Sequence, residues 1–457
     1  MSNTRCAQKY SIIYISNKYL HTCRVFRVYN LSIMLNNTQL NDLLIAEQIR
    51  QRDGLELIPS ENYVSVDVLE SLGSVFTNKY SEGYPGRRYY GGQENTDQVE
   101  NIAIEKAKQL FHADHANVQP HSGAQANESV YHSWMTYGDK ILAMDLSHGG
   151  HLTHGHPVTV LAKQFDFIRY RIKDVETGEI DYDLLAEQAH KYKPKIIMAG
   201  YSSFPRMLDY KKFAKIGNDV GALLVADIAH IAGLVAGGVT TNPLDVGFHV
   251  MSTTTHKTLR GPRSGLILSR GVVSNPLSKV DKTIDNIPTL IDRTVFPGVQ
   301  GGPHMNTILA KAVAFDEAQQ LEFKKYAKQI LVNAKKLSDC LMSKGISLVT
   351  NGTDNHMMLL DVKKSMDIDG DIAEKALDKA GLTVNKNVIP DDPLPPFRPS
   401  GVRLGTPAVT TRGMKAPEME IIASLIVDAL HARKDDKALA NIKLQVKDLA
   451  GKFNIPD

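Results

Sequence analysis

The chain has 457 residues, of which 42% are hydrophobic and 23% are charged. This length predicts two or three domains, and the composition excludes a disordered chain, a collagen-like fibre and a disulfide scaffold. With 53 basic and 50 acidic residues, the formal net charge is +3, which gives no electrostatic support for nucleic-acid binding. A small number of cysteines favours a reducing compartment, and they are Cys6, Cys23 and Cys340.

Residues 1–33 form a basic leader that holds five basic residues and no acidic one. The rest of the chain has 48 basic and 50 acidic residues and is slightly acidic. The leader lacks the uninterrupted apolar run of a secretory signal, and its composition fits a mitochondrial transit peptide loosely. The alternatives are a true start at Met34, which an amphipathic first helix follows, or an extension without function. We expect a cytoplasmic protein, and a mitochondrial one only if the leader is a genuine transit peptide.

Apolar runs of strand length alternate with charged segments of helical period through the middle of the chain. The expected strands include 140–144, 195–199, 223–226, 250–253 and 265–269. The expected helices between them include 182–192 and 211–220. This alternation predicts βαβ units and a mostly parallel sheet that is covered on both faces.

One apolar stretch, residues 222–239, is long enough to cross a bilayer. Asp227 and His230 interrupt it, glycines punctuate its second half, and an ionised carboxylate in lipid is costly. We therefore expect a buried strand, a turn and short helical segments here, and no membrane association.

A long amphipathic helix is expected from Met305 onward, joining a large domain to a smaller C-terminal one. The smaller part mixes apolar runs with helix-like segments, at 346–349, 357–362, 371–380 and 417–433. Its proline-rich segment, 390–401, is either a linker or a shaped loop before Arg403. After the leader, the expected divisions are an N-terminal arm with a helical segment (34–75), a large domain (76–310) and a small domain (311–457).

A lysine and an aspartate lie at the ends of two predicted strands. Lys257 follows strand 250–253 within STTTHKTLRGPR, and Asp227 ends the apolar run LLVAD. A partly desolvated lysine amine acts as a nucleophile or holds pyridoxal phosphate (PLP) as a Schiff base, and a buried carboxylate needs a partner such as a protonated pyridine nitrogen. Ligands bind at the carboxyl ends of strands in open α/β sheets, so the pair favours a PLP site. The alternatives are a solvated surface lysine and a helix-capping aspartate.

Two glycine-containing segments are able to approach an anion. HSGAQAN places Ser122, Gly123 and Ala124 at a predicted helix start, where backbone N–H groups hold phosphate. GVQGGP, residues 298–303, is a second candidate, and an ordinary turn is the alternative for both.

Two further segments carry unusual side chains. SHGGHLTHGHP has four histidines but no cysteine or acidic residue nearby, so a ring stacked on a planar cofactor is favoured over a metal site. YSEGYPGRRYYGG, residues 80–92, is poor core material and predicts a binding surface with Glu82 as an acid–base group.

These motifs, in this order, resemble serine hydroxymethyltransferase, a PLP enzyme of fold type I. The similarity runs from about Leu40 through the C-terminal domain. It rests on LIPSENY (57–63), YSEGYPGRRYYGG (80–92), HSGAQAN (121–127), HGGHLTHG (148–155), ADIAHIAGL (226–234), TTTHKTLRGPR (253–263), FPGVQGGP (296–303) and SGVRLGTPA (400–408). The resemblance implies a large domain with a mostly parallel seven-stranded sheet and a smaller α/β C-terminal domain.

The resemblance also implies roles for single residues. Lys257 would carry PLP, Asp227 would pair with its pyridine nitrogen, and His151 would stack on its ring. The other implied cofactor contacts are Ser122, Gly123, Ala124, His256, Ser202, His230 and Tyr80, with Gly301 and Gly302 from the neighbouring subunit. The implied catalytic residues are Lys257, Glu82, His256 and Tyr90, and no metal is expected. Substrate would contact Ser60, Glu82, Tyr90 and Arg403, folate would contact Leu146, Gly150, Leu152 and Asn387, and Arg263 would anchor the active-site loop.

The implied reaction is the reversible transfer of the hydroxymethyl carbon of serine to tetrahydrofolate. It gives glycine and 5,10-methylenetetrahydrofolate through an external aldimine and a quinonoid. The resemblance further implies a homodimer or a tetramer whose active sites are shared between two chains.

Two rival functions have different consequences. A PLP aldolase or aminotransferase without folate would leave the Glu82 loop and residues 146–152 without a role. A noncatalytic protein on the same fold would not need Lys257, Asp227 and Arg403, all of which are present.

Overall fold

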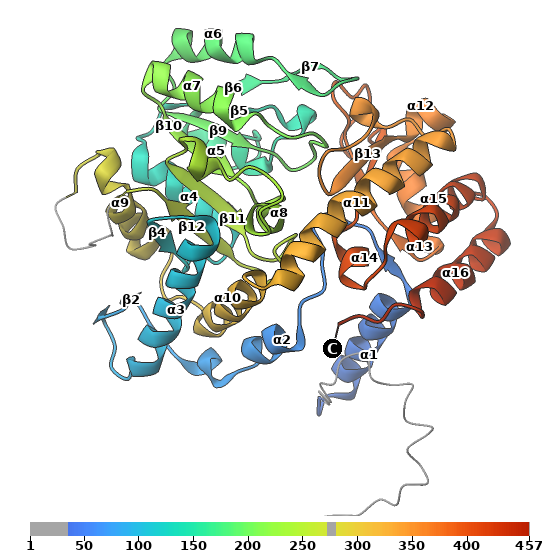
Figure 1. Cartoon of the computed structure of the whole chain (residues 1–457), viewed down its shortest axis with the longest axis horizontal. Coiled ribbons are helices and arrows are strands. Elements are labelled where there is room, and N and C mark those ends of the chain that lie inside the picture. Colours follow the sequence, from blue (N-terminus) through green and yellow to red (C-terminus); the bar gives the residue numbers. More distant parts are fainter. Residues whose placement is uncertain (1–34, 272–279, 457) are drawn as a thin grey trace, which may run out of the picture.

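The computed structural model describes residues 35–271 and 280–456 (Figure 1). The predictions on the leader, residues 1–33, lie outside the described residues. Within them, no helix combines the length and the apolar character that crossing a membrane requires.

A seven-stranded sheet forms the centre of the larger lobe, in the order β4-β12-β11-β10-β9-β5-β6. The bounds of its strands are β4 (His115–Asn117), β5 (Lys140–Met144), β6 (Asp166–Tyr170), β9 (Ile196–Gly200), β10 (Leu223–Asp227), β11 (Val250–Thr254) and β12 (Gly265–Ser269). Only β12 runs antiparallel to its neighbours β11 and β4, so the predicted mostly parallel sheet is confirmed.

Helices cover both faces of this sheet. The helices of this lobe are α3 (Glu94–Phe111), α4 (Gly123–Trp134), α5 (Leu161–Gln164), α6 (Tyr182–Tyr192), α7 (Tyr210–Val220), α8 (Ala232–Ala236), α9 (Ile287–Arg293) and α10 (Met305–Ala318). Leu142 and Leu224 pack with α3, α7 and α10, while their neighbours Ile141 and Val225 pack with α4 and α9. Because successive side chains of a strand point to opposite faces, both sets must be apolar, which explains the continuous apolar runs.

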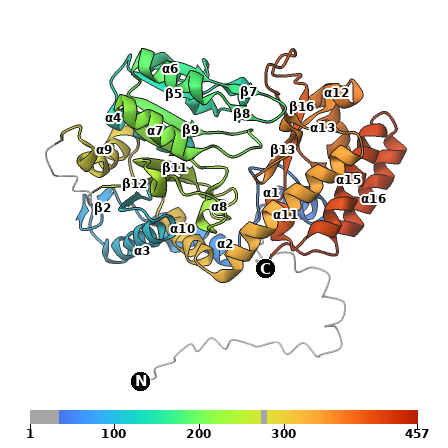
Figure 2. The same cartoon turned by 45° about the horizontal axis from the view of Figure 1, so that its top comes forward.

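The smaller lobe is built on a three-stranded antiparallel sheet, β13-β16-β15. Figure 2 shows the long helix α11 extending from the end of α10 into this lobe. Its elements are α11 (Leu321–Ser343), β13 (Met357–Asp361), α12 (Val362–Met366), α13 (Gly370–Lys379), β14 (Leu382–Thr383), β15 (Asn385–Asn387), β16 (Gly401–Gly405), α14 (Pro407–Thr411), α15 (Ala416–His431) and α16 (Asp436–Ala450). The apolar run 346–349 is buried but forms only an isolated bridge, Leu348 to Leu360, instead of a strand.

The N-terminal arm contacts both lobes. After α1 (Thr38–Asp53), β1 (Leu55–Glu56) pairs in parallel with β14 of the smaller lobe, and α2 (Val66–Leu72) packs on α10 through Val68. Helix α1 has no fully buried residue, and its apolar side chains Leu40, Leu43, Ile45 and Ile49 are exposed in this chain. Two short hairpins complete the structure, β2 (Gly83–Tyr84) with β3 (Arg87–Arg88) and β7 (Ile172–Asp174) with β8 (Glu179–Ile180).

Candidate active site

Lys257 lies in the turn that follows β11 and is only 8% exposed. Burial lowers the pKa of its amine to about 8, while the charge of Asp227 opposes this shift. Within the described residues, Nζ of Lys257 forms no hydrogen bond or ion pair. A buried, partly neutral and unpartnered amine is what covalent capture of an aldehyde requires.

Asp227 ends β10, the strand next to β11, and its carboxylate is fully engaged. Oδ1 accepts the N–H of Ala229 at 3.0 Å, and Oδ2 accepts from Nδ2 of Asn127 at 2.8 Å and contacts Nε2 of His154 at 3.1 Å. Burial opposes ionisation, but the hydrogen bonds from His154 and Asn127 hold the pKa of Asp227 below its usual range. The carboxylate therefore stays negative at neutral pH.

Asn127 and His154 are functional candidates that sequence reasoning missed. Both stand inside quoted motifs, HSGAQAN and HGGHLTHG, but nothing in the local sequence indicates that they meet Asp227. Asn127 is itself held by Ser252 of β11, whose hydroxyl donates to Oδ1 of Asn127. For Asn127, the sequence offers one indication: it is a polar residue on α4, a helix expected to pack on the sheet, so it is expected to be buried.

His151 is mostly buried in the same cluster, and burial lowers its pKa to about 4, so the ring is neutral at pH 7. Its Nδ1 lies 2.7 Å from Oγ1 of Thr153. His151, His154 and Asp227 lie close enough together to serve as metal ligands. The sequence argument that no acidic ligand lies near these histidines is therefore wrong, because the fold brings Asp227 to them. The direct His154–Asp227 hydrogen bond nevertheless occupies the atoms that a metal would use.

The turn before α4 holds the predicted anion-binding residues. Ser122 caps α4 and accepts from the N–H of Gln125, and Ala124 is exposed in the first helical turn. A methyl group on Gly123 would lie 2.6 Å from Cγ2 of Thr254, so only glycine allows this approach. Within the described residues, Oγ1 of Thr254 is buried without a hydrogen-bond partner. A helix start with a free hydroxyl beside it fits a phosphate group.

Arg403 reaches from β16 of the smaller lobe to the larger one. Its guanidinium donates to the carbonyl and hydroxyl of Ser202 and to Oδ1 of Asn385. All these partners are neutral, and no carboxylate of the described residues forms an ion pair with it. Burial lowers the pKa of Arg403 to about 10, as expected of a buried cation whose charge is not compensated. Such a site is completed by an anion, and a carboxylate suits the planar guanidinium best.

His230 and His356 form a second contact between the lobes. Nδ1 of His230 lies 3.3 Å from Nε2 of His356, and both rings are buried. Burial lowers the pKa of both, helped by the charges of Lys257 and Arg403. Both rings are therefore neutral, so each must adopt the tautomer that suits the other.

The N-terminal arm contacts both the strand that carries Arg403 and the turn that carries Lys257. Gly405 of β16 donates its N–H to the carbonyl of Leu57, which brings half-buried Ser60 close to the end of the strand that carries Arg403. Asn62, from the same LIPSENY motif, donates from Nδ2 to the carbonyl of Lys257 at 3.0 Å. This contact holds the backbone of the lysine turn and was not foreseen from the sequence.

Two further residues of the lysine turn, His256 and Arg263, flank Lys257 in the chain. Burial lowers the pKa of His256 to about 3, with contributions from the charges of Arg263 and Lys257. Arg263 is exposed and forms no hydrogen bond or ion pair within residues 35–271 and 280–456. Its expected role as a loop anchor stays a prediction.

The tyrosine-rich loop is a separate cluster. Tyr80 packs edge to face with Tyr90 at 5.1 Å, and its hydroxyl lies 3.3 Å from Oε1 of Glu82. A methyl group on Gly301 would lie 3.3 Å from Oε1 of Glu82, and one on Gly302 would lie 3.2 Å from the ring of Tyr80. Among the described residues, Tyr80, Glu82 and Tyr90 make no hydrogen bond, ion pair or ring contact with Lys257, Asp227 or Arg403.

Arg88 fixes the backbone of this loop at Glu82. Its Nη1 donates to the carbonyls of Ser81 and Gly83, the residues on either side of Glu82, at 2.8 and 2.9 Å. The other guanidinium nitrogens pair with Asp97 and with buried Glu100. Nothing in the local sequence indicates that Arg88, rather than Arg87, is the buried member of the pair.

The predicted folate segments come from two lobes. Leu146 and Leu152 are partly and half exposed, and a methyl group on buried Gly150 would lie 2.3 Å from the carbonyl of Met144. Asn387 ends β15, and the loop after it is tied to this segment by His148, whose Nε2 lies 3.2 Å from Oδ1 of Asp391. The contact between His148 and Asp391, two residues that the prediction did not include, therefore joins the segment 146–152 to the loop after Asn387.

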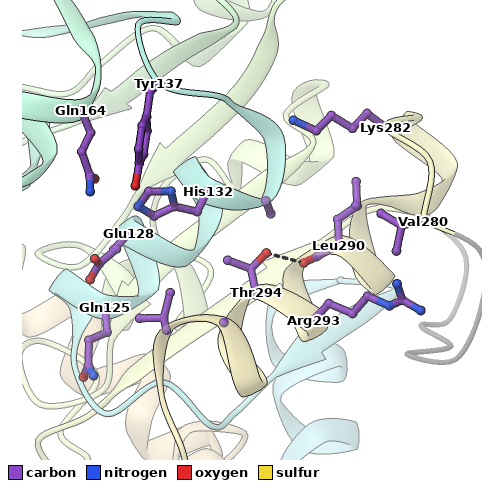
Figure 3. Close-up of a pocket in the computed structure, with 13 residues that line it drawn as sticks. Gln125, Glu128, His132, Tyr137, Gln164, Val280, Lys282, Leu290, Arg293 and Thr294 are labelled. Carbon is purple, nitrogen blue, oxygen red and sulfur yellow. Dashed lines mark hydrogen bonds between the residues drawn. The ribbon is translucent and has the colours of Figure 1, made fainter.

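A pocket of about 620 Å³, lined by both polar and apolar side chains, lies beside α4 and not at Lys257. Figure 3 shows His132 and Tyr137 on one side of it and Lys282 and Arg293 on the other. Gln125 lines this pocket and also contacts Ser122, so the pocket lies beside the turn predicted to bind an anion.

A buried lysine and a buried carboxylate at adjacent strand ends, on a mostly parallel sheet with a smaller second lobe, define a PLP-dependent enzyme of fold type I. The family model of serine hydroxymethyltransferase matches residues 33–426. The chain belongs to this family, which is the family that the sequence motifs predicted. Its members interconvert serine and glycine with PLP as cofactor, and they transfer the one-carbon unit to and from tetrahydrofolate.

Proposed function

We propose that this chain carries out the family reaction at the site around Lys257, Asp227 and Arg403. The observation that carries the proposal is that two buried cationic side chains, Lys257 and Arg403, lack an anionic partner in contact with them. PLP, when bound, supplies the electron sink for breaking a bond at the substrate Cα. Lys257 would hold it covalently, Asp227 would keep its ring nitrogen protonated, and the neutral ring of His151 would stack on it.

The phosphate of the cofactor would lie at the Ser122–Gly123 turn. The N-terminus of α4 offers backbone N–H groups and a positive partial charge, and Gly123 leaves room for a close approach. Ala124 would add an N–H group from the first turn of α4. His256 directly precedes Lys257, and its buried Nδ1 has no hydrogen-bond partner within the described residues, so it would be able to donate to the phosphate.

The substrate carboxylate would bind Arg403, with Ser60 as a second contact. Binding there fixes the orientation of the amino acid and so selects which Cα bond breaks. Ser202 would hold the guanidinium in place, and His230 would contact the cofactor ring oxygen, kept in one tautomer by His356. Folate would lie along Leu146, Gly150 and Leu152, with Asn387 opposite.

We further propose that two chains share each active site. Tyr80 and Tyr90 are 56% and 47% exposed, and Glu82 is held beside them without contact to the lysine of its own chain. This exposure supports a role in a partner's site for Tyr80, Glu82 and Tyr90, with Glu82 moving a proton. Gly301 and Gly302 lie in the same cluster, and the carbonyl of Gly302 lies 3.2 Å from Nε2 of His121 of its own chain. In a shared site the two glycines would also contact the partner's phosphate.

Mixing two inactive chains tests this sharing. Lys257→Ala and Glu82→Gln chains would be unfolded together, refolded together and assayed for serine cleavage. In a shared site, half of the hybrid dimer sites would combine an intact Lys257 with an intact Glu82, and activity would return. If each chain builds its own complete site, the mixture stays as inactive as its components.

An absorbance titration tests the cofactor and folate assignments. The expected result is a visible band of bound PLP that Lys257→Ala lacks, and a new long-wavelength band only when glycine and tetrahydrofolate are both present. A PLP band that tetrahydrofolate leaves unchanged would contradict the assignment of folate binding to Leu146, Gly150, Leu152 and Asn387. Absence of any PLP band after incubation with cofactor would contradict the site itself.

We also propose a cytoplasmic location and the domain bounds 34–75, 76–310 and 311–457. The low cysteine number supports the location. The separate apolar clusters of the two lobes support a division into two main units, but the cluster of the larger lobe continues past residue 310 into α11 as far as Ile330. Microscopy of tagged chains that begin at Met1 or Met34 tests the first, since a mitochondrial signal for the longer chain alone would identify a transit peptide. Limited proteolysis with mass mapping tests the second.

A further inference from the structure

Lys311 of α10 is a buried cation outside the site described above. It is 1% exposed, and its Nζ lies 2.6 Å from the carbonyl oxygen of Val118, 2.7 Å from that of Gly265 and 3.5 Å from that of Pro120. An ammonium group has three N–H donors, so each has an acceptor here. No carboxylate pairs with it in the described part of the chain, and its contacts are with backbone carbonyls alone.

These carbonyls lie where the anion-binding turn begins. Pro120 precedes His121 and Ser122 by one and two residues, and its carbonyl also accepts from the N–H of Gly265 and the hydroxyl of Ser264. A methyl group on Gly265 would lie 2.3 Å from the carbonyl of Ser122, so β12 presses directly on the turn. Lys311 therefore ties the segment that follows β4 to the first residue of β12, next to Ser122.

Gln300 holds the opposite side of the same segment. Its Nε2 donates to the carbonyl of Gln119 at 2.7 Å, and its Oε1 accepts the N–H of His121 at 3.3 Å. Lys311 donates to the carbonyls of residues 118 and 120, while Gln300 donates to the carbonyl of residue 119 and accepts the N–H of residue 121. The chain leading into the turn is thus fixed at every residue from Val118 to His121.

The charge of Lys311 also acts on the turn. It is one of the causes that lower the pKa of His121, after burial and the charge of His304. Burial lowers the pKa of Lys311 itself to about 7, with Glu100 opposing the shift, so near neutral pH its amine is charged in only part of the molecules and a nearby anion would favour the charged form. Burying a lysine costs stability, and an uncharged side chain would avoid that cost. A positive charge beneath a phosphate site offsets this cost when the anion binds.

We infer that Lys311 is a positioning residue for the phosphate-binding turn, holding Val118–Pro120 and Gly265 in register and adding positive potential below Ser122. The inference rests on the proposed placement of the cofactor phosphate at Ser122 and Gly123. It concerns binding of the phosphate group and assigns Lys311 no contact with the reacting atoms.

Comparison of PLP with pyridoxal, which lacks the phosphate, tests the inference. Apoenzyme would be titrated with each compound, following the bound-cofactor absorbance, for wild type, Lys311→Met, Lys311→Arg and the exposed control Lys335→Met. For Lys311→Met we expect the Kd of PLP to rise by about 10- to 100-fold and that of pyridoxal by less than about 3-fold. Lys311→Arg, which keeps charge and donors, should restore much of the preference for PLP, and Lys335→Met should match wild type.

The outcomes separate this inference from the proposed function. A Ser122→Ala chain that keeps the wild-type ratio of the two Kd values would overturn the placement of the phosphate. If Ser122→Ala lowers the preference for PLP but Lys311→Met leaves it unchanged, or weakens both ligands equally, Lys311 has no phosphate-specific role. Should Lys311→Met not fold, Lys311→Gln keeps a hydrogen-bond donor without the charge and carries the same test with the same expected Kd values.

Discussion

Nε2 of His154 lies 3.1 Å from Oδ2 of Asp227, although the two residues are 73 positions apart in the chain. Both side chains are buried, and Asn127 donates to the same oxygen. The ionised state of Asp227 therefore depends on a neighbour from a different loop of the sheet edge.

Removing His154 should weaken both the fold and the cofactor site. His154→Phe keeps a ring of similar size but loses the hydrogen bond to a buried carboxylate, which costs about 1.5–3 kcal/mol. We expect that loss in the free energy of unfolding of the apoenzyme in urea, together with a higher Kd for PLP. The half-buried neighbour in the same segment, His156→Phe, is the matched control, and equal effects of both changes would contradict the role of His154.

Capture of PLP should become faster as the pH rises through about 8. Burial lowers the pKa of Lys257 from its ordinary 10.5 to about 8, so the nucleophilic neutral amine appears well below pH 10.5. Between these values the unfolded chain binds more protons at this lysine than the folded chain. The contribution of Lys257 to stability therefore also rises with pH in that window. Stopped-flow mixing of apoenzyme with PLP across pH 6–10 measures the rate, and a midpoint near 10.5 would show a solvated lysine.

Arg403→Lys should impair serine binding without releasing the cofactor. Lysine keeps the positive charge but cannot form the paired hydrogen bonds of a guanidinium to a carboxylate. We expect kcat/KM for serine to fall by about 10- to 100-fold, mainly through KM, with an unchanged Kd for PLP. Arg398→Lys, an exposed change in the same lobe, is the control. A fall in kcat alone would argue against carboxylate binding at Arg403.

Arg88→Lys should lower turnover by loosening Glu82. A lysine side chain is shorter and has one ammonium group, so it cannot bind the carbonyls of Ser81 and Gly83 and also pair with Asp97 and Glu100. The positive charge beside buried Glu100 is kept, so the protein should still fold. We expect kcat to fall by about 10-fold with little change in KM for serine, because the change misplaces Glu82 and leaves serine binding at Arg403 intact. The exposed neighbour Arg87→Lys should retain wild-type kinetics, and a matching loss there would contradict the prediction.

Strand and helix positions in the larger lobe were predictable because local pattern and tertiary burial agree there. The runs that form β5 and β12 are apolar throughout, as strands covered on both faces must be, and α6 has a helical period with a polar outer side. The run 346–349 shows where pattern is insufficient. Ile346, Leu348 and Val349 are buried against the smaller lobe, but hydrogen-bond pairing does not follow from burial.

The motifs of the sequence identified the family, and the alternation of strand-like and helix-like segments predicted the parallel sheet. Asp227 was placed because it ends a recognisable apolar strand, and Lys257 because it follows the next predicted strand within a few residues. What holds these residues in their working state depends on contacts that form only in the folded chain. His154 and Asn127 keep Asp227 ionised, Asn62 fixes the backbone of Lys257, Arg88 holds Glu82 and Lys311 supports the turn at Ser122. A buried polar side chain must find its partners wherever the chain folds back upon it, and the spacing of residues along the sequence carries no record of those contacts.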